Sequence, residues 1–569
     1  MTTTPAKEKR ITGVEAKHIS YVEHQGGKPS DALIVKERIH YDDKTTADRL
    51  RIYENMQRPY WVTHKGKRKH QQKRDAELIG NLQEYKSTQI DLARNAAKSL
   101  GMYDKLARPY LPEIAQSPYL YGTDVTSACI LKHMYQQRCP ETRSLNKVAA
   151  TDIETDVVNK TDNILMQATS CKEKVIFYVD RNFLSDIPNA EEEIRKEAFA
   201  ELGDIFKERG IKDIDIRLVN TPGEIVAGSI AATHEMQPDF LTAWNADFEI
   251  KAFIRTLEKE GYNLADVFSD KSVPPEYRIF DYNPGSRYKI TASGKKIGKD
   301  PADIWNWLRH AASWQMIDSM TVYRALRLAG GKEQSYALDP ILEKETKLKK
   351  LRFKEAEQYK GLRWHEVMQT RYKIKYCVYN IFDAISLEIL DEKTTDLSAR
   401  ISTTSGPSEY RHLNSNPKRL CDAFHFWYLN RENKKVIASS SNQQEHELDK
   451  YVVSPTDFIV TLAAFLVAPE GLDCIEEAPG MKTLVWIHVA DLDVAATYPN
   501  VSQILNISPS TCVFEFSRME GISEMRRKAL GVNLTGGKVN ALPILQEYLG
   551  APSLDTLLAA FKEEEKIEA

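Results

Sequence analysis

Between residues 148 and 257, short apolar runs typical of strands alternate with segments whose apolar residues have helical spacing. This alternation constrains the fold more than any other feature. Ala190–Arg209 has apolar residues at helical intervals and is followed by Gly210, a residue that commonly ends a helix. A second helix is predicted over Glu249–Leu257. The strand candidates are Val175–Val179, Ile214–Val219 and Phe240–Trp244. Strands that alternate with helices predict an α/β sheet in the middle of the chain.

The remaining residues predict a mixed α+β multidomain protein. A chain of 569 residues is too long for one hydrophobic core. Turn-rich segments precede residue 148, and a Ser/Thr/Gly-rich stretch, Ile401–Ser408, follows the α/β region. We therefore expect three regions, with boundaries at 1–148, 149–395 and 396–569.

Composition excludes several classes of protein. No apolar run is long enough to span a bilayer, and residues 1–10 lack the apolar core of a secretory signal. The 7 cysteines are scattered without a Cys-x-x-Cys pair, so neither a zinc site nor a disulfide framework is predicted. We expect a cytoplasmic protein with reduced cysteines and no membrane partner.

Charge is patchy on this chain, whose net charge is −3. Any one basic cluster is ordinary solvated surface, but several of them suit a nucleic-acid track that runs between acidic sites. The three clusters are Lys65–Arg74, Lys295–Lys299 and Lys347–Lys354.

Two acidic motifs predict a metal-dependent nuclease site. Asp152 and Glu154 lie two residues apart on a predicted strand, so their side chains share one face. Hydrolysis of a phosphodiester with two divalent ions needs a carboxylate cluster, and oxygen ligands favour Mg²⁺ or Mn²⁺. Tyr379 and Asp383 lie one helical turn apart, so Asp383 can complete the cluster while Tyr379 orients the attacking water.

These motifs, with Asn245-Ala-Asp-Phe-Glu249 between them, resemble the DEDD-type 3′–5′ exonuclease domain of family B DNA polymerases. Asp152-Ile-Glu154 resembles its first motif and Tyr379-Asn-Ile-Phe-Asp383 its third, in the Tyr-x-x-x-Asp form. The resemblance implies an RNase H-like fold and two Mg²⁺ or Mn²⁺ ions held by four carboxylates. Those ligands would be Asp152, Glu154, Glu249 and Asp383.

The second motif departs from the family pattern, because Glu249 stands where an aspartate is expected. Asp247 is a nearby alternative, although the apolar spacing around Phe248 favours Glu249. The resemblance places Asn245 and Phe248 in contact with substrate, whereas Asn245 alone would be read as a helix cap. We expect no catalytic role for Asp318, which lies farther along the chain.

Trp486–Pro499 resembles motif A of the polymerase palm, and Asn506–Thr511 extends the resemblance towards large tailed-phage enzymes. Asp493 matches the metal-binding aspartate of a second two-ion site, and Tyr498 matches the tyrosine that packs against the incoming sugar. The family's lysine-bearing fingers motif and its Tyr-x-Asp-Thr-Asp hairpin do not follow in this sequence. We therefore expect the site that begins at Asp493 to need groups from another polypeptide.

Three hypotheses follow from these motifs. The leading one is the N-terminal part of a split family B DNA polymerase, with a proofreading exonuclease between an N-terminal domain and a partial palm. Its partners would be DNA, a second chain that carries fingers, motif C and thumb, and a sliding clamp reached through that chain. The alternatives are a stand-alone 3′–5′ exonuclease with a vestigial palm and a non-catalytic DNA-binding replication subunit.

Overall fold

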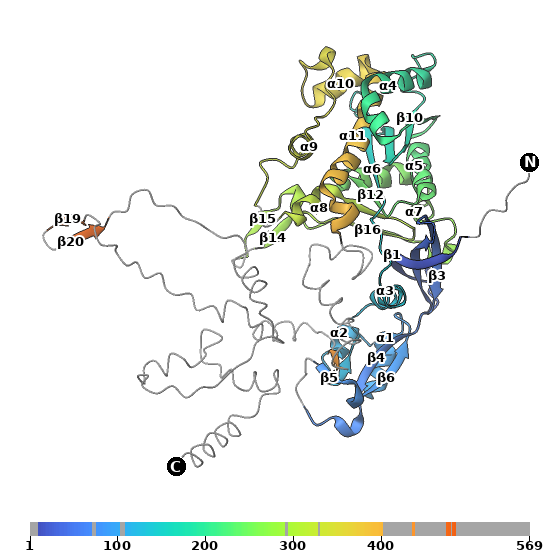
Figure 1. Cartoon of the computed structure of the whole chain (residues 1–569), viewed down its shortest axis with the longest axis vertical. Coiled ribbons are helices and arrows are strands. Elements are labelled where there is room, and N and C mark those ends of the chain that lie inside the picture. The colour runs from blue at the N-terminus through green and yellow to red at the C-terminus, as the bar shows by residue number, and fades with distance from the viewer. Residues whose placement is uncertain are drawn as a thin grey trace, which may run out of the picture. The chain divides into compact units, whose positions relative to one another are not determined.

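The protein is a mixed α/β chain with several sheets, as predicted (Figure 1). It divides into two compact units, residues 1–440 and 441–569. The computed structural model describes residues 9–70, 76–102, 109–123, 125–290, 294–327, 331–401, 435–437, 474–478 and 481–484. In the second unit it describes an antiparallel hairpin of β19 (Cys474–Ala478) and β20 (Met481–Leu484). Asp493 and Tyr498 of the predicted polymerase site lie outside the described residues.

Antiparallel sheets and short helices form the N-terminal part of the first unit. One sheet has the order β1-β2-β3 and another the order β6-β4-β7, while β5 pairs with β18. Helix α3 packs on β1. The bounds are β1 (Ile11–Glu23), β2 (Asp31–Tyr41), β3 (Thr46–Glu54), β4 (Arg58–Thr63), β5 (Ala76–Leu78), β6 (Leu82–Ser87), β7 (Leu120–Tyr121), β18 (Lys435–Ile437), α1 (Leu92–Leu100), α2 (Leu111–Ile114) and α3 (Ser127–Arg138).

A six-stranded sheet of order β11-β10-β9-β8-β12-β17 forms the centre of this unit. Strand β9 runs antiparallel to its neighbours β8 and β10, and the other neighbouring pairs are parallel. The strands are β8 (Val148–Thr155), β9 (Ile164–Cys171), β10 (Lys174–Asp180), β11 (Asp215–Val219), β12 (Phe240–Ala243) and β17 (Gln315–Asp318). The strands predicted at 175–179, 214–219 and 240–244 are confirmed within one residue at each end.

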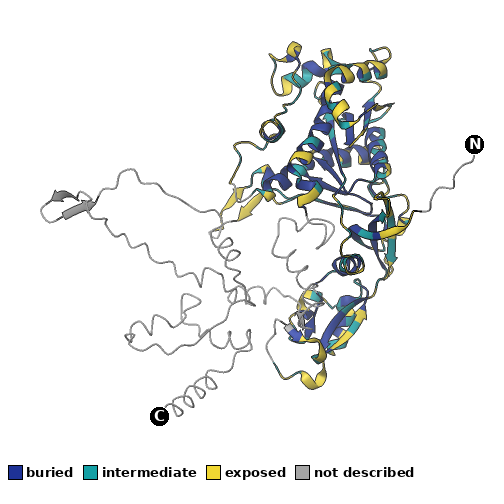
Figure 2. Cartoon of the chain, in the orientation of Figure 1, coloured by how far each residue is buried: buried dark blue, intermediate teal, exposed yellow. Residues whose placement is uncertain are grey.

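Helices cover both faces of the sheet, so its strands are buried on both sides (Figure 2). Helices α4 (Ala190–Arg209) and α11 (Lys373–Thr394) share a core with Ala150, whereas α5 (Pro222–Met236) and α6 (Ala246–Lys259) share another with Ala149 and Ile153. Because side chains of a strand alternate between faces, the even-numbered residues of β8 point towards α11. Asp152 and Glu154 follow Ala150 on that face.

The helix predicted over Ala190–Arg209 is confirmed at both ends. Gly210 lies in the left-handed region at φ +71°, and its N–H closes the last turn of α4. The second predicted helix begins at Ala246, three residues before Glu249. Both carboxylates of the second motif, Asp247 and Glu249, therefore lie in the first turn of α6, where the helix dipole favours negative charge.

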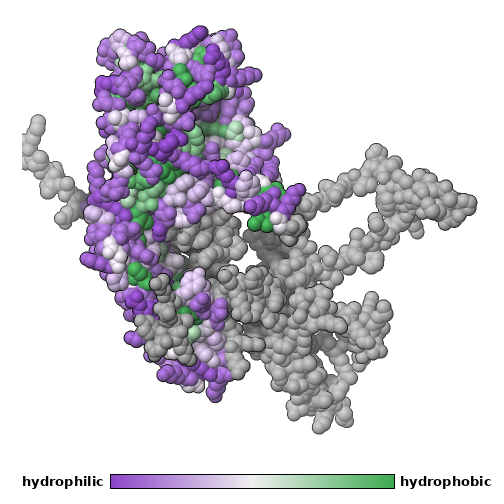
Figure 3. Space-filling model, turned by 180° about the vertical axis from the view of Figure 1, so that it is seen from behind, coloured by the Kyte–Doolittle hydropathy of each residue, from purple (hydrophilic) through white to green (hydrophobic). Residues whose placement is uncertain are grey.

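Smaller elements complete the first unit. The hairpin of β14 and β15 carries exposed Tyr288, Ile290 and Ile297. Most of the described surface visible in Figure 3 is hydrophilic, with smaller hydrophobic areas between. In the described residues, no helix combines the length and apolar character required to cross a membrane. The bounds are β13 (Phe280–Asn283), β14 (Tyr288–Ile290), β15 (Lys296–Gly298), β16 (Trp307–His310), α7 (Leu264–Phe268), α8 (Ser319–Leu326), α9 (Leu338–Thr346) and α10 (Leu362–Arg371).

Buried ion pairs join the N-terminal sheet to the central sheet. Asp239, which immediately precedes β12, is fully buried and pairs with Lys36 and Arg38 of β2 at 2.8 Å each. Lys36 is also buried and donates to the carbonyls of Gln237 and Pro238, both at 2.8 Å. Two carbonyl acceptors and an ion pair thus compensate the buried ammonium, which is the condition for burying a lysine.

Candidate active site

The first-motif carboxylates lie where β8 extends past its neighbour. Strand β12 pairs with β8 only as far as Ala150, so Asp152 and Glu154 lie beyond the last residue of β8 that pairs with β12, although both still pair with β9. The carboxyl ends of parallel strands β8, β12 and β17 meet at this edge, which is where open α/β sheets commonly bind ligands. Residues that follow β12 and β17 can therefore approach Asp152.

Helix α11 brings the third motif to this edge. Asn380 donates to Asp152 Oδ2 at 2.7 Å, and the Tyr376 hydroxyl donates to Glu154 Oε2. Tyr379 and Asp383 lie on the same helix and are buried. Their spacing of four residues places them one turn apart, as the sequence predicts.

Lys350 lies among these groups. Its ammonium donates to Asp383 Oδ2 at 2.5 Å and to the Tyr379 hydroxyl at 2.9 Å. Burial alone would lower the pKa of Lys350, but the Asp383 and Asp152 carboxylates raise it overall. Lys350 therefore stays cationic and offsets part of the negative charge of the cluster.

The structure separates the two candidates of the second motif. Glu249 is 4% exposed, and burial followed by the nearby Asp152 carboxylate raises its pKa well above the usual range. Asp247 instead accepts from Lys251 Nζ at 2.5 Å and from the Tyr282 hydroxyl. Glu249 is thus the member of the motif that interacts with the cluster.

The cluster is electrostatically unfavourable by itself. Burial, and then the charges of Asp383 and Glu154, raise the pKa of Asp152 well above its ordinary value. Burial also raises the pKa of Asp383, although Lys350 opposes that shift. Carboxylates gathered in a poorly solvated site resist ionisation unless cations compensate them.

Divalent cations fit this arrangement. Among the described residues, Glu249 Oε2 and Asp383 Oδ1 are buried oxygens without a hydrogen-bond partner. Buried polar atoms are rarely left without a partner, and hard oxygen ligands suit Mg²⁺ or Mn²⁺. In the same part of the chain, no group of three His, Cys, Asp or Glu side chains is already assembled around a metal position. Asp152, Glu154, Glu249 and Asp383 are the residues that would hold such ions.

The predicted substrate contacts lie at the start of α6. Phe248 is 49% exposed, and Asn245 is exposed in the left-handed region at φ +69°. Asn245 occupies the cap position, but its side chain makes no capping hydrogen bond. Asp318 accepts from the N–H groups of Asn245 and Ala246 instead, at 3.2 and 3.1 Å. Burial raises the pKa of Asp318 to about 6, and its role is to anchor the turn that presents Phe248.

Sequence reasoning missed several side chains of this site. Tyr376 and Asn380 share the inner face of α11 with Tyr379 and Asp383, so helical periodicity could have indicated them. Lys350 appeared only as one member of a basic cluster. His365 of α10 has its Nδ1 3.6 Å from Glu154 Oε2. Nothing in the sequence around His365 indicates that it lies at this site.

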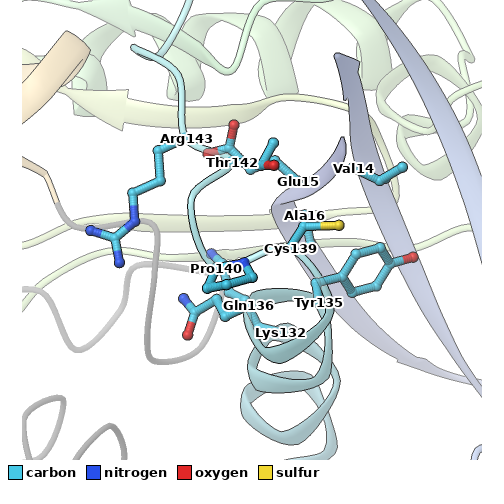
Figure 4. A pocket seen from close by; sticks show the side chains of 10 residues that line it. All are labelled: Val14, Glu15, Ala16, Lys132, Tyr135, Gln136, Cys139, Pro140, Thr142 and Arg143. Atoms are coloured by element: carbon cyan, nitrogen blue, oxygen red, sulfur yellow. The ribbon is translucent and has the colours of Figure 1, made fainter. Parts of the chain in front are cut away.

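A small cavity lies away from this cluster, between β1 and α3 (Figure 4). Its volume is about 20 Å³, which suits about one water molecule and no nucleotide. Lys132, Tyr135 and Cys139 of the α3 region line it. This cavity is therefore too small to be the candidate active site.

Comparison with known proteins adds no assignment. No family model matches the chain, and no match was found among curated proteins.

Proposed function

We propose that this chain is a two-metal 3′–5′ exodeoxyribonuclease. The observation that carries the proposal is the convergence of four carboxylates, from β8, α6 and α11, at one sheet edge beside Tyr379 and Lys350. Two of these carboxylates, Glu249 and Asp383, each have a buried oxygen without a hydrogen-bond partner among the described residues. The strand order also supports it, because β10-β9-β8-β12-β17 with an antiparallel β9 fits the expected RNase H-like domain.

The chain's own residues divide the work of hydrolysis between them. Two divalent ions held by the four carboxylates would activate a water and stabilise the charge that develops on the phosphate. Burial, and then the Asp383 charge, raise the pKa of Tyr379 well above its ordinary value, so its hydroxyl stays protonated. Tyr379 therefore orients the water by hydrogen bonding and does not act as a base.

The exposed residue at the edge of the site, Phe248, would select the substrate. Exposed Phe248 offers an aromatic surface on which an unpaired terminal base can stack, and stacking is tolerant of sequence. A mismatched 3′ end separates from its template at lower cost than a paired one. The site would thus remove mismatched ends preferentially and release deoxynucleoside monophosphates.

The full chain, incubated with Mg²⁺ and a 5′-labelled single-stranded DNA, tests the proposal. We expect the labelled DNA to shorten by one nucleotide at a time from its 3′ end. We also expect the reaction to stop when EDTA removes the metal. A DNA blocked at its 3′ end serves as the matched control. A chain that degrades no DNA with either Mg²⁺ or Mn²⁺ would support the non-catalytic replication subunit.

We propose further that this exonuclease belongs to a split family B polymerase that acts in the cytoplasm, the host's if a phage encodes it. The motif A resemblance at Asp493 and Tyr498 carries this second proposal. We expect the purified chain to extend no primer, and Asp493→Ala to impair synthesis only when the completing chain is present. Primer extension by this chain alone would contradict the split arrangement. Unimpaired synthesis by Asp493→Ala with that partner would favour a stand-alone exonuclease.

A further inference from the structure

Glu154 has a dedicated hydrogen-bond donor in Tyr376. The Tyr376 side chain is fully buried, and its hydroxyl donates to Glu154 Oε2. Its ring lies nearly parallel to that of Tyr379, with an interplanar angle of 6° and centroids 6.2 Å apart. Two neighbouring tyrosines of α11 therefore reach different partners, Tyr376 the Glu154 carboxylate and Tyr379 the Lys350 ammonium.

His365 is a second partner of the Tyr376 hydroxyl. Its Nδ1 lies 2.9 Å from the Tyr376 oxygen, and the two rings meet edge to face. Because the single hydroxyl proton of Tyr376 goes to Glu154, the shared proton of this second hydrogen bond must come from His365 Nδ1. The chain of donors thus runs from His365 through Tyr376 to Glu154.

Gln369 ties the same helix, α10, to the backbone at the end of β8. Its amide nitrogen donates to the Thr155 carbonyl at 2.7 Å, and its amide oxygen accepts from the Val157 N–H at 3.2 Å. Gln369 is 3% exposed, so both hydrogen bonds are shielded from water. Helix α10 therefore holds the main chain next to Glu154 as well as its side chain.

We propose that Tyr376 and His365 are positioning residues that fix the Glu154 carboxylate for divalent-metal binding. The inference rests on the proposed nuclease function. Asp152 and Asp383 are already held by Asn380 and Lys350. Glu154 is a longer side chain on a part of β8 that pairs with β9 but not with β12. Groups that hydrogen-bond to metal ligands commonly change metal affinity or activity by 10–100-fold when they are removed.

Mn²⁺ binding to the full chain, measured by titration calorimetry, tests the inference without relying on catalysis. Tyr376→Phe keeps the buried ring and removes only the hydroxyl. We expect its Mn²⁺ dissociation constant to rise about 10–100-fold. We also expect kcat on single-stranded DNA to fall by a similar factor, with KM for DNA unchanged within about threefold.

His365 supplies the second variant and its rescue. His365→Leu removes the donor from a partly exposed position, where loss of folding is not expected, and should shift Mn²⁺ binding in the same direction as Tyr376→Phe. His365→Asn puts an amide N–H close to the Nδ1 position, so it should restore binding to within about threefold of the wild type.

The outcomes separate the inference from the function on which it rests. Wild-type affinity and kcat in both Tyr376→Phe and His365→Leu would overturn the positioning role and leave the nuclease standing. Equal loss in His365→Leu and His365→Asn would overturn the hydrogen-bond chain. A wild-type chain that neither binds Mn²⁺ nor degrades DNA would overturn the proposed function, and this inference with it.

Discussion

Glu249→Gln is expected to reduce exonuclease activity by about 10³-fold, a loss of about 4 kcal/mol of transition-state stabilisation. The substitution keeps the size of the side chain and removes its charge. Glu249 is the buried second-motif residue whose carboxylate interacts with Asp152, and its Oε2 has no partner among the described residues. The measurement is the initial rate of dNMP release from single-stranded DNA at saturating Mg²⁺.

Asp247→Asn is the matched control for this prediction, because it removes a carboxylate two residues away on the same helix. Asp247 is occupied by Lys251 and Tyr282, so activity should stay within about threefold of the wild type. The reverse result, with Asp247→Asn inactive and Glu249→Gln active, would make Asp247 the ligand of the second motif.

Asp239→Ala is expected to lower the free energy of unfolding of the first unit by about 3–5 kcal/mol. The reason is that Lys36 and Arg38 would remain buried without their shared carboxylate. Urea titration of the full chain measures the change. Glu343→Ala is the control, because it breaks an exposed ion pair with Lys349. The Glu343 side chain is 51% exposed and the Lys349 side chain 56%. That change should cost less than about 1 kcal/mol.

The contribution of Asp239 to the free energy of unfolding should also depend on pH. Burial would raise the pKa of Asp239, but Lys36 and Arg38 outweigh it and hold the pKa below its ordinary value. A carboxylate with a lowered pKa in the folded state stabilises the protein above its unfolded pKa, and that contribution is lost as pH falls. The difference between Asp239→Ala and wild type should therefore be full at neutral pH and shrink below about pH 4. A difference that grows on acidification would contradict this interpretation.

Local sequence pattern predicted most of the central sheet because its signals are short-range. Gly210 ends α4 at the point where the helical spacing of apolar residues stops. The apolar run Val175–Val179 predicts a buried strand. The start of α6 was placed three residues late, because a carboxylate from a distant strand, Asp318, satisfies its first N–H groups. Asn245 is a local signal for a helix start at this point, but its side chain makes no capping hydrogen bond, and nothing in the local sequence indicates the contact with Asp318.

The carboxylates of the candidate site were predicted from their order and resemblance, whereas the groups that hold them were not. Asn380 lies inside the third motif, yet its role depends on the Asp152 side chain, 228 residues away in sequence. Lys350 looks like its exposed basic neighbours until folding places it at Asp383. Partners of this kind arise from packing between distant segments, which a single sequence does not encode at any fixed spacing.

The salt bridge between Arg38 and Asp239 also sets an order of events during synthesis, since 201 residues separate the two. At ribosomal rates of about 5–20 residues per second, β2 would leave the ribosome roughly 10–40 s before its acidic partner. Until then Arg38 can pair with Asp48 of β3, but both Lys36 and Arg38 lack the carboxylate of Asp239. The nascent chain thus has to reach the central sheet before the charges on its second strand are fully paired.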